Sequence, residues 1–226
     1  MKDAIKRVPV LAPIARTISR TYRALVKPFP GSAEYWDRRY CSGGNSGPGS
    51  FRKLAEFKAE IVNGFVNEKN IKNIIEFGCG DGTQLKLAKY PPYTGYDVSP
   101  EAVSLCRSKF ADDKRKTFRL MKDYNGETAE LTLSLDVIYH LVEDEVFEQY
   151  MNRLFDSSEG YVLVYSSDGD VNGCGQADHV RHRRFTKWVE KSEPKWRLIR
   201  HIPNRYPFGG DNRTGSFADF FLFEKA

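Results

Sequence analysis

The chain has few cysteines, and they follow no recognised spacing. Four thiols, at positions 41, 79, 106 and 174 of the 226 residues, form neither a Cys-x-x-Cys pair nor a zinc-finger pattern. The four histidines also lack a metal-ligand spacing, so no metal is predicted. Reduced thiols in a cytoplasmic protein are the simplest interpretation of this cysteine usage.

The sequence also lacks long hydrophobic runs. No apolar stretch approaches the roughly 18 residues of a transmembrane helix, and the first residues lack the uninterrupted apolar core of a secretory signal peptide. The hydrophobic fraction of 40% and the charged fraction of 29% are those of an ordinary globular protein. The length allows a single domain with a substantial core.

Positive charge is concentrated near the N-terminus. Residues 1–30 carry seven basic side chains and one acidic side chain, a net charge of +6, whereas the whole chain has +5. Apolar and basic residues fall on opposite helical faces, which predicts a basic amphipathic leader helix that Pro28 and Pro30 end. Such a helix can contact an anionic membrane from its inner face. Packing against the domain and a frayed terminus are the alternatives.

The segment at residues 74–82, which reads IIEFGCGDG, carries the most information. An apolar run ends in a carboxylate, alternating glycines follow, and a second apolar run ends at Asp97, 21 residues after Glu76. This pattern predicts a strand, a glycine turn, a helix and a second strand that delivers an acid to ribose hydroxyls. The spacing is Gly-x-Gly-x-Gly, whereas dinucleotide folds use Gly-x-Gly-x-x-Gly, which disfavours an NAD oxidoreductase.

From residue 73 onward, strand-like and helix-like segments alternate, which predicts a mainly parallel sheet covered on both faces. The expected strands cover residues 73–77, 93–97, 117–121, 129–135, 161–167, 196–202 and 216–224. The expected helices cover residues 83–89, 100–110, 143–156 and 185–192. Ser99 and Pro100 suit the start of the second helix.

Three motifs together resemble class I S-adenosylmethionine-dependent methyltransferases. Residues 73–82 resemble the first motif of that family, and Asp97 is similar to its ribose-binding acid. The run SLDVIYHL at residues 134–141 resembles its fourth-strand motif. The resemblance covers roughly residues 35–226. It implies a seven-stranded, mostly parallel Rossmann-like sheet with helices on both faces and a C-terminal antiparallel hairpin.

The same resemblance divides the chain into two parts. We expect the leader helix at residues 1–30 and a methyltransferase domain at 31–226, with a lid and helix at 31–70 and the Rossmann-like core at 71–226. The lid contains the run CSGGNSGPGS at residues 41–50, which is too rich in glycine for regular structure. In similar methyltransferases such a segment lies over the cleft, so we predict a mobile lid; a flexible linker is the alternative.

The resemblance implies that S-adenosylmethionine is bound and S-adenosylhomocysteine is the product. Glu76 would meet the methionyl ammonium, usually through water in this family, and Asp97 would accept both ribose hydroxyls. Asp123 is similar to the acceptor of the adenine amino group, although a turn carboxylate is the alternative. The glycines would let the backbone approach the ligand. The predicted cofactor residues are Glu76, Gly78, Cys79, Gly80, Gly82, Asp97, Val98, Asp123, Tyr124 and Asp136.

Asp136 and His140 are the candidate catalytic residues. They lie four positions apart, just beyond the fourth expected strand, at the sheet edge where ligands bind in open α/β folds. An imidazole titrates near neutrality, so His140 could take a proton from a hydroxyl. A histidine that caps or packs the loop is the alternative.

The run DHVRHRRF at residues 178–185 predicts a substrate-binding wall, since this region follows the fifth strand in similar methyltransferases. Arginine side chains suit carboxylate or phosphate, and a solvated charge run is the alternative. The predicted substrate-binding residues are Tyr40, Asn45, Ser46, His179, Arg181, His182, Arg183 and Arg205.

We therefore expect methylation of an oxygen on a glycan or another small polar or anionic acceptor. The chain resembles small bacterial methyltransferases associated with surface-polysaccharide assembly. A hydroxyl acceptor would need a base, whereas an ionised oxygen would need only positioning. A methyltransferase acting on RNA or protein and a non-catalytic S-adenosylmethionine-binding partner protein stay as alternatives. The near-zero charge outside the leader disfavours nucleic acid, and no Asn-Pro-Pro-Tyr-like motif of amino-group methylation is present.

Overall fold

The computed structural model describes residues 29–173 and 176–226. The expected leader helix falls almost entirely on residues 1–28, outside the described residues, as does Cys174. Within the described part of the chain, no helix is long and apolar enough to cross a membrane. No three histidine, cysteine, aspartate or glutamate side chains of those residues are grouped as a metal site.

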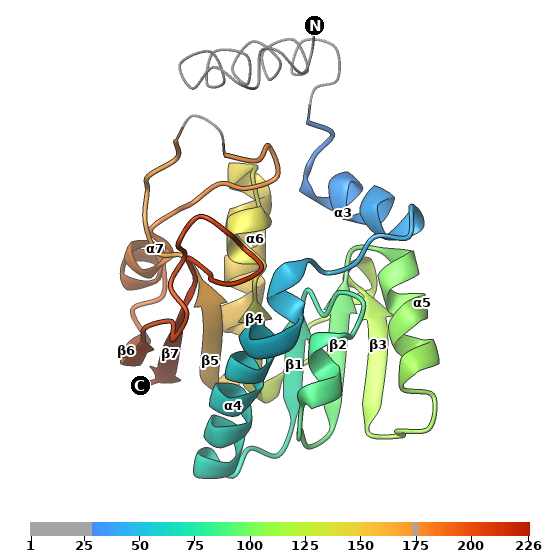
Figure 1. Cartoon of the computed structure of the whole chain (residues 1–226). Helices are drawn as coiled ribbons and strands as arrows, with labels where there is room; N and C mark the ends of the chain where they lie inside the picture. The colour runs from blue at the N-terminus through green and yellow to red at the C-terminus, as the bar shows by residue number, and fades with distance from the viewer. Residues whose placement is uncertain (1–28, 174–175) are drawn as a thin grey trace, which may run out of the picture.

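A seven-stranded sheet forms the centre of the molecule, with the strand order β3-β2-β1-β4-β5-β7-β6 (Figure 1). Strands β1 to β5 pair in parallel, and β7 runs antiparallel between β5 and β6. The strand bounds are β1 (Ile74–Phe77), β2 (Tyr93–Asp97), β3 (Lys116–Leu120), β4 (Ala129–Leu135), β5 (Ser158–Ser166), β6 (Trp196–Ile202) and β7 (Asp219–Lys225). The predicted sheet, with its C-terminal antiparallel hairpin, is confirmed.

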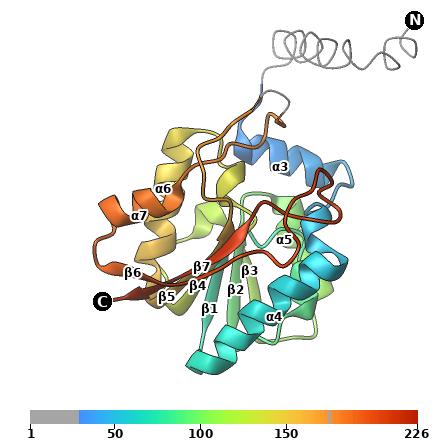
Figure 2. The same cartoon turned by 60° about the vertical axis from the view of Figure 1, so that its left-hand side comes forward.

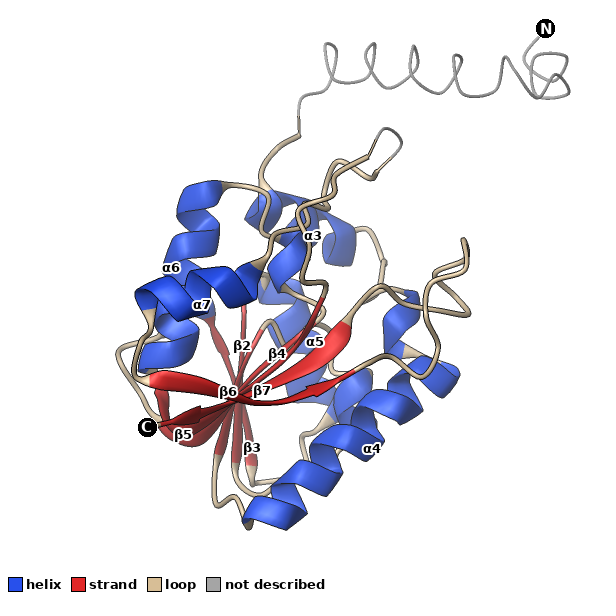
Figure 3. Cartoon of the chain, turned by 90° about the vertical axis from the view of Figure 1, so that its left-hand side faces the viewer, coloured by secondary structure: helices blue, strands red, loops and turns tan. Residues whose placement is uncertain are grey.

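Helices cover both faces of this sheet (Figures 2 and 3). Side chains of α4 (Arg52–Lys69) and α5 (Pro100–Lys109) pack with Ile74 in one apolar cluster. Those of α6 (Asp144–Asp156) and α7 (Phe185–Ser192) pack with Ile75 and Phe77 in a second cluster. Alternate residues of β1 therefore face opposite layers, and this is why the strand reads as a continuous apolar run.

Local chemistry fixes the ends of these helices. The Ser99 hydroxyl accepts the Ala102 amide at 3.3 Å, and Pro100 occupies the first turn of α5, as the sequence predicts. Helix α4 ends at Asn70, whose φ of 53° is the left-handed conformation common after a helix.

The prediction of a helix at residues 83–89 is wrong. Only a single 3-10 turn, η2 (Gln84–Leu87), forms there. The Asn63 side chain on α4 takes the backbone groups that a helix would need, since it donates to the Leu87 carbonyl and accepts from the Lys89 amide. Two prolines follow at once and cannot continue a helix.

The predicted lid and helix region places α3 (Ser32–Cys41) and the short η1 (Pro48–Ser50) over the carboxyl ends of the central strands (Figure 1). Ser32 donates its amide to Glu143 at 2.8 Å, and the Ser99 hydroxyl donates to Asp37 at 2.7 Å. The Ser46 hydroxyl also donates to Asp81 at 2.9 Å. Hydrogen bonds to three parts of the core therefore hold this segment.

Candidate functional site

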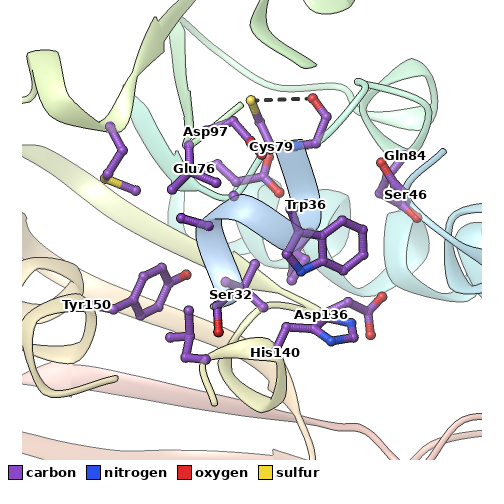
Figure 4. Close-up of a pocket in the computed structure, with 18 of the residues that line it drawn as sticks. Ser32, Trp36, Ser46, Glu76, Cys79, Gln84, Asp97, Asp136, His140 and Tyr150 are labelled. Carbon is purple, nitrogen blue, oxygen red and sulfur yellow. Dashed lines mark hydrogen bonds between the residues drawn. The ribbon is translucent and has the colours of Figure 1, made fainter. Parts of the chain in front are cut away.

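Two adjoining cavities lie at the carboxyl edge of the sheet, under α3. The first has a volume of about 130 Å³ and is lined by the glycine turn after β1 and by the end of β2. The second, of about 580 Å³, lies between η1, the residues around 176–182 and those around 208–217. Both cavities are lined by Trp36, Ser46, Asp136 and His140. These four residues mark the junction of the two spaces, and Figure 4 shows them among the residues that line the first cavity.

The glycine turn approaches its neighbours too closely for side chains. Gly78 and Gly80 have φ values of 86° and 56°. A Cβ atom would lie 2.4 Å from the side chain of Val137 at the first position and 2.4 Å from Ser46 Oγ at the second. Glycine is therefore required at both positions by conformation and by space, and bare backbone borders the first cavity.

Asp97, at the end of β2, is buried in the first cavity. Its Oδ2 accepts the Gly80 amide at 2.9 Å, and its Oδ1 accepts the Ser99 amide at 3.0 Å. Burial raises the pKa of this carboxyl to about 6, although the backbone amides oppose the shift. Each oxygen keeps a further lone pair, so the side chain can still accept hydroxyl groups of a ligand.

Glu76 is the second buried acid of this cavity. The Tyr93 hydroxyl donates to its Oε2 at 2.5 Å, and Figure 4 places Glu76 beside Asp97 at one side of the cavity. Burial raises the pKa of Glu76 to about 7, against the opposing effects of Tyr93 and the Lys58 charge. Gln84 lines the same cavity, and its Oε1 is buried without a hydrogen-bond partner among the described residues. The cavity thus offers an unsatisfied acceptor as well as two acids.

Three of the predicted cofactor residues do not line the first cavity. Gly82 packs against α5, where a Cβ atom would lie 2.9 Å from Cys106 Sγ. The Tyr124 hydroxyl donates to the Glu127 carbonyl at 3.1 Å, so the side chain is used within the fold. Asp123 is exposed, and Met121 lines the cavity instead. The remaining predicted residues do line it, namely Glu76, Gly78, Cys79, Gly80, Asp97, Val98 and Asp136.

Asp136 follows β4 with an unusual backbone. Its φ of 62° is left-handed, which is uncommon for a residue other than glycine. Lys58 Nζ lies 2.5 Å from its Oδ2, and the Tyr139 hydroxyl donates to its Oδ1 at 2.7 Å. Both carboxylate oxygens are therefore engaged. Lys58 is only 2% exposed, and nothing in the sequence analysis singled it out.

His140 lies in the 3-10 turn η4 (Ile138–His140), at the junction of the cavities. Its Nδ1 is 2.9 Å from the carbonyl oxygen of His179. A carbonyl only accepts, so Nδ1 carries the proton and Nε2 bears the lone pair. Burial lowers the pKa of His140 to about 4. Its Nε2 has no hydrogen-bond partner among residues 29–173 and 176–226, which leaves it available to a ligand.

The structure spreads the predicted substrate-binding residues over three environments. Tyr40 lines the first cavity, Ser46 lines both, and His179 and His182 line the second. The Asn45 side chain accepts the Gly47 amide at 2.9 Å and so holds the loop.

The three predicted arginines line neither cavity. Arg181 and Arg183 donate to the Val142 carbonyl, each at 2.8 Å, and both pair with Asp144 at 3.0 Å. Arg205 pairs with Glu60 at 2.6 Å on the surface. Other residues line the second cavity instead, among them Trp36, Arg39, Tyr139, Gln176, Phe208, Asn212 and Phe217.

Comparison with known proteins identifies the fold. Neither a scan of protein-family models nor a search of curated proteins gives a match. The N-methyltransferase NodS from Bradyrhizobium japonicum WM9, in complex with S-adenosylhomocysteine, matches with a TM-score of 0.66 and 14% identity, over 86% of this chain and 98% of its own. The fold is that of class I methyltransferases.

Two further structures share this methyltransferase fold. Magnesium protoporphyrin IX methyltransferase (ChlM) from Synechocystis PCC 6803, with bound S-adenosylhomocysteine, matches at a TM-score of 0.57 and 14% identity, over 75% of this chain and 83% of its own. An S-adenosylmethionine-dependent methyltransferase from Clostridium acetobutylicum ATCC 824 matches at a TM-score of 0.54 and 10% identity, over 74% of this chain and 90% of its own. At these identities the likeness concerns the fold, and the site is argued from the residues of this chain.

The buried position of His140 predicts an unusual titration. Nitrogen-15 NMR should show a neutral Nδ1–H imidazole down to about pH 5, with a midpoint near the pKa of about 4. The folded-state pKa is lower than the unfolded value of about 6.5, so this residue's contribution to stability is lost as pH falls from about 6.5 toward 4. The variant His140→Gln assigns the resonance. A midpoint near 6.5 would contradict the buried environment.

Proposed function

We propose that this protein is an S-adenosylmethionine-dependent methyltransferase that methylates an oxygen of a polar acceptor, such as a glycan or another small hydroxylated molecule. The observation that carries the proposal is the pair of adjoining cavities. One is bordered by a glycine turn and a buried acid after β2, and the other meets it at His140. The shared fold supports the same function, because NodS and ChlM are methyltransferases with S-adenosylhomocysteine bound.

The residues of the first cavity suit this cofactor. Asp97 has lone pairs for two ribose hydroxyls, and the bare backbone at Gly78 and Gly80 allows a ligand to lie against it. Glu76 can pair with the methionyl ammonium, and the Gln84 Oε1 atom offers that group a further acceptor. Bound cofactor would supply a methyl group made electrophilic by its positively charged sulfur.

The chain itself must align the acceptor, exclude water and manage one proton. Trp36, at the junction, covers the site from α3, and Ser46 closes the same edge from the lid. His140 Nε2 is placed to accept the proton of an acceptor hydroxyl. The Asp136 charge raises the pKa of His140 and so favours the imidazolium that this transfer would form.

The second cavity favours a hydroxyl acceptor over an anionic one. Its histidines, His140, His179 and His182, all have lowered pKa values because burial disfavours their charged forms. Arg181 and Arg183, which the sequence suggested as anion ligands, already bind carbonyls and Asp144. Arg39 does line this cavity, but its Nε donates to the Asn45 carbonyl at 2.7 Å, and the carboxylate of Asp211 lines the same space. Aromatic rings and hydrogen-bonding side chains both line this cavity, a lining that suits a molecule with apolar faces and hydroxyl edges.

Cofactor binding should depend on Asp97. The variant Asp97→Asn places an amide opposite the Gly80 N–H, and we expect roughly 10- to 100-fold weaker binding of S-adenosylhomocysteine, since hydrogen bonds to charged groups contribute about 1.5–3 kcal/mol. Isothermal calorimetry measures this directly. Asp112→Asn, at an exposed position, is the matched control. Equal affinity of wild type and Asp97→Asn would remove the ribose assignment.

The raised pKa values of Glu76 and Asp97 predict that binding releases protons. A ligand ammonium and ligand hydroxyls favour the ionised acids, so affinity should rise between about pH 5 and 7.5. In the free protein, the pKa values of Glu76 and Asp97 are higher in the folded state than in the unfolded state. Their contribution to the free energy of unfolding is therefore lost as pH rises through the same window. Calorimetry in buffers of different ionisation heat counts the protons. Glu76→Gln should reduce the count, and no proton exchange in wild type would refute the prediction.

The proposed base predicts the effect of a single substitution. His140→Ala should slow methyl transfer by about two to four decades if a neutral hydroxyl is the acceptor. Binding of S-adenosylhomocysteine should change little, because the contacts to ribose and ammonium remain. Near-normal turnover would instead indicate an acceptor oxygen that is already ionised.

The acceptor class is tested by methyl-label transfer. Protein and labelled S-adenosylmethionine are incubated with separate fractions of bacterial envelope glycans, nucleic acids and proteins. Label in the glycan fraction is expected, and label only in RNA or protein would exclude our proposal. A role in surface-polysaccharide assembly, a cytoplasmic location and membrane contact through residues 1–30 stay predictions from the sequence.

A further inference from the structure

A buried lysine, Lys58, lines the first cavity beside the junction and has no assigned role in the proposed chemistry. Lys58 lies on the inner face of α4, between the buried residues Leu54 and Val62, where an apolar side chain would be ordinary. Its side chain is 2% exposed, and its Nζ lies 5.4 Å from the centre of the Tyr165 ring. Burial of a charge is unfavourable unless it is paired, so the partner of Lys58 explains its place.

That partner is Asp136, whose conformation is otherwise unfavourable. The backbone at Asp136 is left-handed, and its amide donates to the Tyr165 carbonyl at 2.9 Å. Its side chain is anchored by Lys58 Nζ at 2.5 Å. Gly49 of η1 covers the ion pair so closely that a Cβ atom there would lie 3.1 Å from Asp136 Oδ2. Strained residues of this kind persist where the surrounding structure holds them, often at functional sites.

The ion pair reaches His140 through Tyr139. The Tyr139 hydroxyl donates to the second oxygen of Asp136 at 2.7 Å. The ring of Tyr139 lies 4.5 Å from the ring of His140, centre to centre. A continuous set of contacts therefore joins Lys58 on α4 to the η4 turn that carries His140.

We propose that Lys58 is a positioning residue, which fixes Asp136 in its left-handed conformation and thereby orients His140 toward the acceptor. The significance of this role for methyl transfer rests on the proposed function. The structural part of the proposal, that Lys58 controls the environment of His140, does not depend on the proposed function. The simpler alternative is that Lys58 only neutralises a buried carboxylate, which would affect stability and leave His140 unchanged.

The test compares the imidazole of His140 in variants of the full chain. Lys58→Met removes the ammonium and keeps much of the side-chain volume, whereas Lys58→Arg keeps the positive charge. Lys53→Met is the matched control, because Lys53 lies on the same helix and is exposed. Long-range proton–nitrogen spectra report the tautomer of His140, and His140→Gln assigns its signals.

In wild type, in Lys53→Met and in Lys58→Arg we expect a single Nδ1–H tautomer. In Lys58→Met we expect the His140 signals to be an average over the two imidazole tautomers. We also expect methyl transfer to the acceptor to fall at least roughly tenfold. Unchanged His140 signals in folded Lys58→Met would overturn the proposal, because a purely stabilising ion pair predicts that result. If Lys58→Met does not fold, Lys58→Gln carries the test, since its side chain is polar but one atom shorter and uncharged, and it leaves Asp136 in place. Unchanged His140 signals in folded Lys58→Gln would overturn the proposal in the same way.

The two proposals fail in different ways. Absence of S-adenosylhomocysteine binding by wild type would contradict the proposed function and leave the His140 comparison readable. Normal cofactor binding and methyl transfer, together with a His140 spectrum that does not respond to Lys58→Met, would contradict only the positioning role.

Discussion

The burial of charge at the carboxyl edge of the sheet is the constraint on which this site depends. Lys58, Glu76, Asp97 and Asp136 are all removed from most solvent, and each needs a compensating partner. Backbone amides serve Asp97, and Lys58 serves Asp136. Glu76 has only a tyrosine hydroxyl and a more distant charge, so its pKa rises to about 7. The least compensated groups therefore face the space where a charged or hydroxylated ligand would lie.

The second cavity differs, because three histidines line it together with charged side chains of both signs, Arg39, Asp136 and Asp211. Its histidines are held toward the neutral form by burial. The hydrogen bond from Nδ1 to the His179 carbonyl gives His140 a single orientation of donor and acceptor. For the proposed hydroxyl acceptor, a weakly basic nitrogen suits a proton that moves only as the oxygen begins to bond to the methyl carbon. The fold thus separates a cavity with two buried acids from a cavity lined by three histidines.

The arginine run at residues 178–185 shows how strongly tertiary structure decides the role of a charged side chain. In sequence it reads as an anion-binding wall. In the structure Arg183 donates to the carbonyls of Leu141 and Val142, and Arg181 shares the second of these. The arginines thereby hold the segment between β4 and α6, which contains His140. Neither arginine lines the second cavity.

Sequence by itself determined the glycine turn and the acids near the carboxyl ends of β1 and β2, because these depend on local periodicity and on spacing near one turn. The seven-stranded sheet with its antiparallel hairpin was predicted through the family resemblance, and only the structure shows the strand order. It also placed Asp136 and His140 at the ligand-binding edge. It missed the short η2 turn, since Asn63 competes for that backbone from a distant helix. It did not identify Lys58 among 35 basic residues, although Lys58 lies four residues from both Leu54 and Val62 and so falls on the apolar face of its helix. Only the packing of α4 against Asp136 and Tyr165 makes that lysine a buried cation, and packing is not encoded in local pattern.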